Sequence, residues 1–358
     1  MTPAASRPAA NPWPGRLRKA ASALVKLVLS GGLIWWAASQ ADLDAVADRM
    51  AEVDWAWLLP LAALVLLQAV LLCLRFHWVL GGALSGAADP PPRFWPVART
   101  VLAGLLFNQP FPSTLGGDVA RVVLLRRMGV PLGIAFSAVV ADRGAAMLAM
   151  LLAMVAALPL LGLLEDRILP ADRATILATG LAAGAVAVAV LAGLVLLRHL
   201  RWLGQRPALL ARIAGLYAAI RAGLLGSGRL PAILLAAVAG HFLTALFGLC
   251  IAAALGIPLS PAMALLLIPP VLLIAQIPVS VAGWGVREAA MVTALGFAGL
   301  APADAFLVSV GIGLATLAQG LAGGLVWSLS GAVAARASAR GTKPPAEKRS
   351  DITAPLEP

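Results

Sequence analysis

Two short motifs rich in proline and glycine interrupt an otherwise apolar chain, and they constrain its fold more than any other feature. The first is Asn108-Gln-Pro-Phe-Pro-Ser-Thr-Leu-Gly-Gly-Asp-Val-Ala-Arg121, and the second is Gln276-Ile-Pro-Val-Ser-Val-Ala-Gly-Trp-Gly-Val-Arg287-Glu288. Each contains a proline, then Ser-x-x-Gly, then an arginine, and the two lie about half a chain apart. Broken helices at matching positions of two halves are typical of membrane proteins built from inverted repeats.

Composition places the chain in a membrane. Hydrophobic residues make up 61% of it, whereas soluble domains contain roughly 45–50%. The net charge of +11 is explained by basic loops that orient the protein in an inner membrane, so we expect no nucleic-acid partner. The two cysteines, Cys73 and Cys250, lie inside apolar segments, which argues against a disulfide and a cysteine-based metal site. No phosphate-binding G-x-x-x-x-G-K-[ST] motif occurs, and we expect no cofactor.

The hydropathy pattern predicts an all-α polytopic membrane protein. A full span needs roughly 20 apolar residues, and about six segments qualify. These predicted spans are residues 21–39, 56–74, 133–164, 174–197, 231–255 and 304–332. Four shorter apolar segments flank the two motifs, and we interpret them as the arms of two re-entrant helical hairpins. These arms are residues 94–107, 119–128, 261–275 and 285–297. A further helix, 207–225, is predicted at the interface.

Charge in the loops predicts the orientation. The loop 40–56 is acidic and is expected outside, whereas the loop after residue 197 and the C-terminal tail are rich in arginine and are expected in the cytoplasm. The two hairpins then enter from opposite sides, as an inverted repeat requires. The predicted divisions are a basic cytoplasmic N-terminus, 1–20; a transmembrane domain, 21–332, with halves 21–164 and 174–332; and a disordered cytoplasmic tail, 333–358.

The motifs offer an anion site at helix N-termini, where unpaired N–H groups and the helix dipole favour negative charge. In the first motif, Ser113 or Thr114 is expected to cap a helix that begins near Gly117. Glycines leave the backbone uncovered, so a phosphate can approach closely. The second motif is expected to repeat this arrangement with Ser280 and Gly283.

Six charged residues fall within the apolar region: Asp118, Arg121, Asp142, Arg143, Arg287 and Glu288. Each would cost roughly 2.5–3.5 kcal/mol at the centre of a lipid-exposed helix, so they must pair or line an aqueous cavity. Arg121 follows Asp118 by three residues and shares its helix face. Asp142 and Arg143 are adjacent and point about 100° apart, so each needs a partner elsewhere. These charges serve either as anion contacts or as structural ion pairs.

Three sets of residues carry a family resemblance: Asn108-Gln-x-x-Pro-Ser-x-x-Gly-Gly-Asp-x-x-Arg121, the Asp142-Arg143 pair, and Pro278-x-Ser-x-x-Gly-Trp-Gly-x-Arg287-Glu288. Together they resemble the lysylphosphatidylglycerol synthase transmembrane-region family, also called flippase-like membrane proteins. The resemblance implies movement of aminoacylated phosphatidylglycerol between leaflets, and relatives are associated with hopanoid lipids or lipid-linked glycans. Two-part synthases carry a C-terminal aminoacyltransferase domain, whereas here a short basic tail follows the last predicted span. We therefore do not expect synthase activity.

The expected function is translocation of an anionic or modified phospholipid through a midplane site at the two hairpins. Two alternatives remain: a non-transporting partner of lipid-biosynthesis enzymes, and an intramembrane transferase acting on a lipid carrier, with Asp118, Asp142 or Glu288 as base. No catalytic residue or metal ligand is predicted. The residues expected to contact the lipid are Asn108, Gln109, Ser113, Thr114, Gly116, Gly117, Asp118, Arg121, Asp142, Arg143, Ser280, Gly283, Trp284, Arg287 and Glu288.

Overall fold

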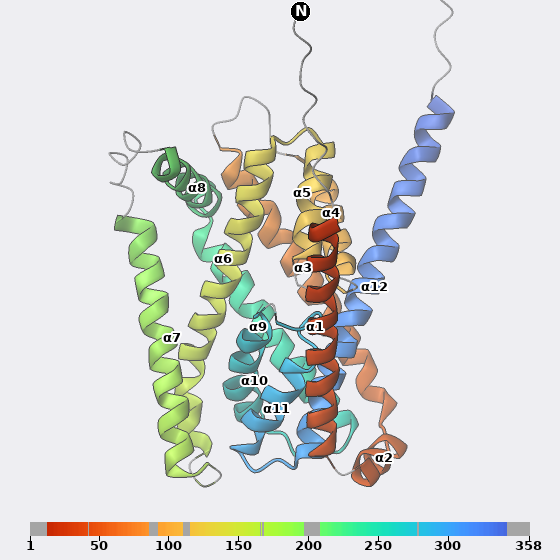
Figure 1. The fold of residues 1–358 in the computed structure, drawn as a ribbon, viewed down its shortest axis with the longest axis vertical. Coiled ribbons are helices and arrows are strands. Elements are labelled where there is room, and N and C mark those ends of the chain that lie inside the picture. Colours follow the sequence, from red (N-terminus) through yellow and green to blue (C-terminus); the bar gives the residue numbers. More distant parts are fainter. Residues whose placement is uncertain are drawn as a thin grey trace, which may run out of the picture.

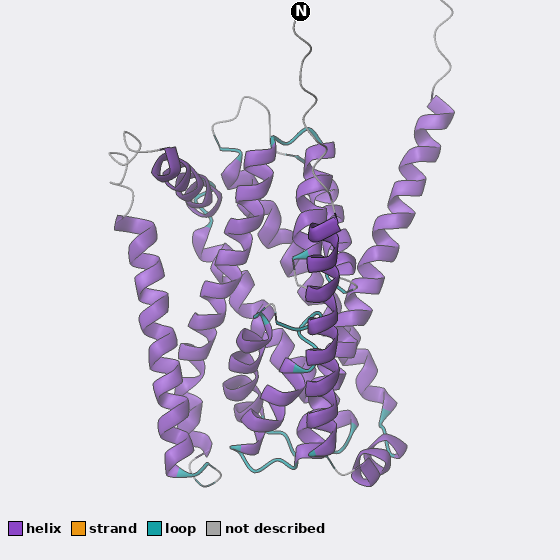
Figure 2. Cartoon of the chain, viewed as in Figure 1, coloured by secondary structure: helices purple, strands orange, loops and turns teal. Residues whose placement is uncertain are grey.

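The fold is a bundle of helices elongated along one axis (Figure 1). The computed structural model describes residues 13–41, 43–85, 92–109, 115–164, 166, 168–196, 208–277 and 279–341. In these ranges the regular secondary structure is entirely helical (Figure 2). The elements are α1 (Trp13–Ser39), α2 (Leu43–Ala51), the 3-10 helix η1 (Trp55–Trp57), α3 (Leu58–Ala83), α4 (Phe94–Phe107), α5 (Gly116–Arg127), α6 (Leu132–Ala157), the 3-10 helix η2 (Leu158–Leu164), α7 (Pro170–Leu196), α8 (Ala208–Leu225), α9 (Leu230–Ala254), α10 (Pro261–Ala275), α11 (Val286–Gly296) and α12 (Pro302–Gly341).

Within the described residues, five segments are long and apolar enough to cross a membrane: Trp55–Ala83, Leu132–Leu164, Pro170–Leu194, Leu230–Ala254 and Pro302–Ser330. The number rises to six if α1 and α2, which meet at an angle of 85°, are counted as one broken span. The chain is therefore a multi-pass membrane protein, as its composition predicts. Helices α4 and α10 are apolar but shorter, and both end at a motif.

Helix boundaries follow most of the apolar segments closely, with four exceptions. Helix α1 begins eight residues before its predicted start at residue 21, and α12 continues to Gly341, so residues 333–341, predicted as part of a disordered tail, are helical. The short helices predicted over 94–107 and 261–275 are confirmed residue for residue. Helix α3, however, continues nine residues beyond its predicted end at residue 74, because Phe76, Val79 and Leu80 extend its buried face. The acidic segment expected to be a loop contains α2, whose Arg49 forms an ion pair with Asp304 at 3.2 Å.

The core consists of two apolar clusters. One is formed mainly by α9, α10, α11 and α12, and the other mainly by α3, α4 and α6. The paired short helices α4 and α5 belong to one half, and α10 and α11 belong to the other. In Figure 1 the C-terminal ends of α4 and α10 both lie near the middle of the long axis. The fold therefore brings the two motifs to the same level of the bundle.

Glycine permits the closest helix contacts around the first pair. A Cβ atom at Gly117 would overlap the backbone carbonyl of Gly104, so α5 can lie against α4 only with glycine there. Helix α12 approaches α4 in the same way, since a Cβ at Gly320 would come within 2.9 Å of the Leu105 carbonyl. Small residues of this kind let membrane helices pack backbone to backbone.

Candidate functional site

A cavity of about 300 Å³ lies between the two motifs. Asn108 and Gln109 line it from the first motif, and Gln276, Trp284 and Arg287 line it from the second. Helix α6 supplies a further wall that includes the Asp142-Arg143 pair, and α12 contributes small residues. Residues that are far apart in the sequence thus share one internal polar space.

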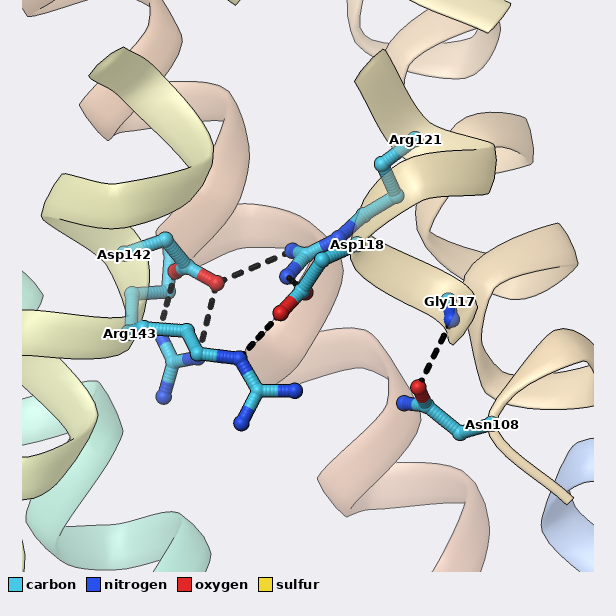
Figure 3. A network of polar contacts seen from close by, with 7 residues as sticks. Asn108, Gly117, Asp118, Arg121, Asp142 and Arg143 are labelled. Atoms are coloured by element: carbon cyan, nitrogen blue, oxygen red, sulfur yellow. Dashed lines mark hydrogen bonds and ion pairs between the residues drawn. The ribbon is translucent and has the colours of Figure 1, made fainter. Parts of the chain in front are cut away.

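Five charged side chains form a continuous network along one side of this cavity (Figure 3). Asp142 accepts hydrogen bonds from Arg75, at 2.7 and 3.1 Å, and from Arg121 at 2.9 Å. The second terminal nitrogen of Arg121 donates to Asp118 at 2.6 Å. The Nε–H of Arg143 donates to the other oxygen of Asp118. The network therefore ties α3, α5 and α6 together through alternating charges.

The network contains more positive than negative charge. Three guanidinium groups share two carboxylates, which leaves one positive charge within these five side chains. Burial is uneven along it: the side chains of Arg75 and Arg121 are 8% and 11% exposed, whereas that of Arg143 is 29% exposed. Arg143 is thus the arginine of this network that an incoming anion can reach most readily.

The first motif is held by Asn108. Its side-chain oxygen accepts a hydrogen bond of 2.8 Å from the backbone N–H of Gly117, in the first turn of α5 (Figure 3). This bond joins the end of α4 to the start of α5 and satisfies one of the unpaired N–H groups of a helix N-terminus. Ser113 and Thr114, the predicted capping residues, lie outside the described residues. Asn108 therefore contributes to capping α5 from the end of α4.

The second motif is organised around Glu288, whose side chain is completely buried. Its carboxylate accepts hydrogen bonds from the backbone N–H of Gly285 at 2.5 Å, from the Arg287 guanidinium at 2.7 and 3.1 Å, and from the Ser309 hydroxyl at 3.2 Å. The Arg287 guanidinium also lies over the Trp284 ring, 4.5 Å from its centre. This site is compact and electrically neutral as a pair.

The backbone of the second motif differs from that of a simple helix start. Gly283 and Gly285 have φ angles of +82° and +87°, which favour glycine, and Ala282 adopts +49°. The N–H of Val281 donates to the Ser30 hydroxyl at 2.8 Å, so α1 braces the turn. Ser280 is buried, and its hydroxyl makes no hydrogen bond to the described residues. The expected repetition of the first motif is therefore wrong in detail, because an acidic side chain caps this helix.

Arg75 is the main site residue that the sequence reasoning missed. It directly follows the predicted span 56–74, at a position where a basic residue usually marks topology, but it is buried and pairs with Asp142. The available signal was the apolar stretch that continues past it, with Phe76, Val79 and Leu80. His241 also lines the cavity, with its Nε2 2.9 Å from the Ala146 carbonyl oxygen.

The fold and the cavity define a class: multi-pass membrane proteins in which two interrupted helix pairs enclose buried arginines. The chain belongs to the family described as the lysylphosphatidylglycerol synthase TM region, whose model matches residues 23–324. This confirms the family that the motifs resemble and makes the chain a lipid-related membrane protein. A search of curated proteins finds no match. Among the described residues, no three His, Cys, Asp or Glu side chains gather where they could hold a metal ion.

Proposed function

We propose that the protein moves an anionic phospholipid between the leaflets of the inner membrane, with the headgroup phosphate passing through the cavity between the motifs. One observation carries the proposal: this internal cavity is lined by four arginines and only two aspartates. The arginines are Arg75, Arg121, Arg143 and Arg287. Buried charge is costly in a membrane and is typical of substrate pathways, and guanidinium groups bind phosphate through paired hydrogen bonds.

The carboxylates in the cavity would compete with the phosphate for the hydrogen bonds that the arginines donate. Asp118 and Asp142 already accept the hydrogen bonds that a phosphate would accept. Asp142 is the more deeply buried, at 3% exposed against 11%, and is held by two arginines. We infer that an entering phosphate displaces Asp118 from Arg121 and Arg143. Exchange of one anion for another keeps both arginines paired while the headgroup is bound, and Asp118 pairs with them again when the headgroup leaves.

The architecture that supports this function is an inverted repeat with two re-entrant hairpins. Helices α4 and α5 have 14 and 12 residues, so each rises about 21 and 18 Å. Helices α10 and α11, with 15 and 11 residues, rise about 22 and 16 Å. None reaches the roughly 30 Å of a hydrocarbon core. Each pair can therefore enter and return on one side, and both termini would be cytoplasmic.

The test is leaflet exchange of fluorescent phosphatidylglycerol in liposomes that contain the purified protein. Arg143→Gln removes the most exposed arginine of the network and should slow exchange at least about tenfold, which corresponds to about 1.4 kcal/mol. Arg126→Gln is the matched control, because Arg126 lies exposed in the last turn of α5 and does not line the cavity. Absence of exchange by the unaltered protein, or equal exchange by both variants, would contradict the proposal and favour a non-transporting partner of lipid-synthesis enzymes.

A further inference from the structure

A second hollow lies beside the polar cavity and has the opposite character. It encloses about 470 Å³ between α1, the α6–η2 segment, α7, α10 and α11. Its walls are made of aliphatic and aromatic side chains, and the only polar side-chain groups among its lining residues are three threonine hydroxyls and the indole N–H of Trp36. We refer to this space as the apolar groove.

The three threonines do not offer their hydroxyls to a ligand. Thr175 donates to the Ala171 carbonyl at 3.1 Å, and Thr179 donates to the Thr175 carbonyl at 2.7 Å. Thr293 donates to the Ala289 carbonyl at 3.0 Å. Each hydroxyl is thus used within its own helix, four residues back. The surface that lines the groove is therefore mainly hydrocarbon, which favours a hydrocarbon ligand.

The groove exists because the helices on its two sides, α7 and α1, pack against different parts of the bundle. Helix α7 packs on α6 and η2, whereas α1 packs on α11 and α12. In Figure 1, α7 stands at one side of the bundle, with α10 and α11 between it and α1. Within a bilayer, an apolar space between membrane-facing helices is filled by lipid tails rather than by water, because water there would lack polar partners.

The groove and the polar cavity share two helices, α6 and α11, in their walls. On α11, Arg287 lines the cavity and its neighbour Val286 lines the groove. On α6, Met150 lines the cavity and Met154 lines the groove, about 6 Å further along the helix axis. A phosphate in the cavity is therefore close enough for the chain attached to it to reach the groove.

We propose that the apolar groove binds an acyl chain of the lipid whose headgroup phosphate occupies the polar cavity. This inference rests on the proposed function and narrows it. The substrate is a long-chain phospholipid that the protein recognises at both ends. A soluble phosphate ester would use the cavity alone. A lipid held at both sites would have its headgroup in the cavity and one acyl chain in the groove at the same time.

The experiment uses phosphatidylglycerol with a photoreactive diazirine midway along one acyl chain, in liposomes containing the full-length protein. After irradiation, crosslinked residues are mapped by mass spectrometry. Crosslinks should concentrate on groove residues of α7 and α11. Ala289→Trp fills the groove and should reduce these crosslinks at least about fivefold, or about 1 kcal/mol. Val188→Trp is the matched control, because Val188 is 67% exposed on α7 and does not line the groove.

Two further variants keep the result decisive. Thr179→Trp fills the groove from an exposed position on α7 and replaces Ala289→Trp if that variant does not fold. Arg143→Gln should also reduce groove crosslinks of the anionic probe, since the chain is anchored through its phosphate. Crosslinks that persist in Arg143→Gln would show a groove filled by bulk lipid and would overturn the inference.

The outcomes separate this inference from the proposed function. Exchange that proceeds at the normal rate in both groove-filling variants, with crosslinks spread over the outer surface, would overturn the acyl-chain site and leave translocation standing. Groove crosslinks that depend on Arg143, in a protein that shows no exchange, would support the acyl-chain site and overturn translocation.

Discussion

The charges of the two motifs are held in different ways. The arginine of the first motif, Arg121, finds its partners on its own helix and on α6, and it shares Asp142 with Arg75 from α3. The arginine of the second motif, Arg287, pairs with the adjacent Glu288. One site thus joins three helices and carries excess positive charge, whereas the other is a neutral pair of neighbouring residues. The comparison teaches that similar sequence patterns hold an arginine in two ways, through partners on other helices in one half and through an adjacent glutamate in the other.

The largest difference should appear when the two buried carboxylates are neutralised. Asp142→Asn leaves Arg75 and Arg121 facing each other and should destabilise the protein by about 3–5 kcal/mol. Glu288→Gln also leaves a buried arginine without its counter-ion, but one arginine rather than two, and keeps an oxygen that can accept the Gly285 and Ser309 hydrogen bonds. We expect the lower end of the same range, about 3 kcal/mol. Chemical unfolding in detergent micelles measures both. Equal losses of unfolding free energy in the two variants would contradict the contrast between the sites, because they would show that each site depends on its carboxylate to the same extent.

A methyl group added at each site should separate stability from function. Gly117→Ala pushes against the backbone of Gly104, which cannot move aside, and should cost about 1–3 kcal/mol of stability. Gly313→Ala meets instead the side chains of Arg287 and Trp284. Because side chains can shift, it should change stability by less than about 1 kcal/mol and slow lipid exchange by displacing Arg287. A strongly unstable Gly313→Ala would show that the second site is as tightly built as the first.

The smallest effect is expected from Asp118→Asn, and its sign is informative. Removing this charge frees Arg121 and Arg143 from a competing carboxylate. Binding of soluble glycerol phosphate, measured by calorimetry, should tighten about threefold to tenfold, or about 0.7–1.4 kcal/mol. Arg126→Gln gives the baseline for a change of one charge outside the cavity. Weaker binding by Asp118→Asn would mean that Asp118 positions the arginines rather than competes for their hydrogen bonds.

Local features of the sequence predicted much of the fold and part of the site. Apolar segments and prolines predict the short helices at 94–107 and 261–275, and spacing predicts the Asp118–Arg121 pair. The partners of Asp142 were beyond reach, because they depend on how α3 and α5 pack against α6. Arg75 was misread for the same reason: an arginine near a span end resembles a topology marker until its tertiary partner is known. Whether these residues bind lipid stays a prediction.

The same dependence on tertiary structure explains the capping of the two short helices. A hydroxyl just before a helix is the common local solution, and the sequence reasoning chose it for α5. Ser113 and Thr114 lie outside the described residues, so that expectation stays a prediction. Within the described residues the Gly117 N–H donates to Asn108, nine residues earlier, because the end of α4 meets the start of α5. At α11, Glu288 reaches back from within the helix to the N–H of Gly285. Only the second of these contacts is local enough to be read from sequence.

The sharing of Asp142 between Arg75 and Arg121 has a mechanical consequence. Because one carboxylate holds guanidinium groups from two other helices, sliding α3, α5 or α6 past one another would strand a charge in hydrocarbon. We therefore expect these three helices to keep their positions relative to one another. If the protein moves a headgroup as proposed, we expect the motion in the opposing wall, because Arg287 and its counter-ion Glu288 are both on α11 and stay paired when that helix moves.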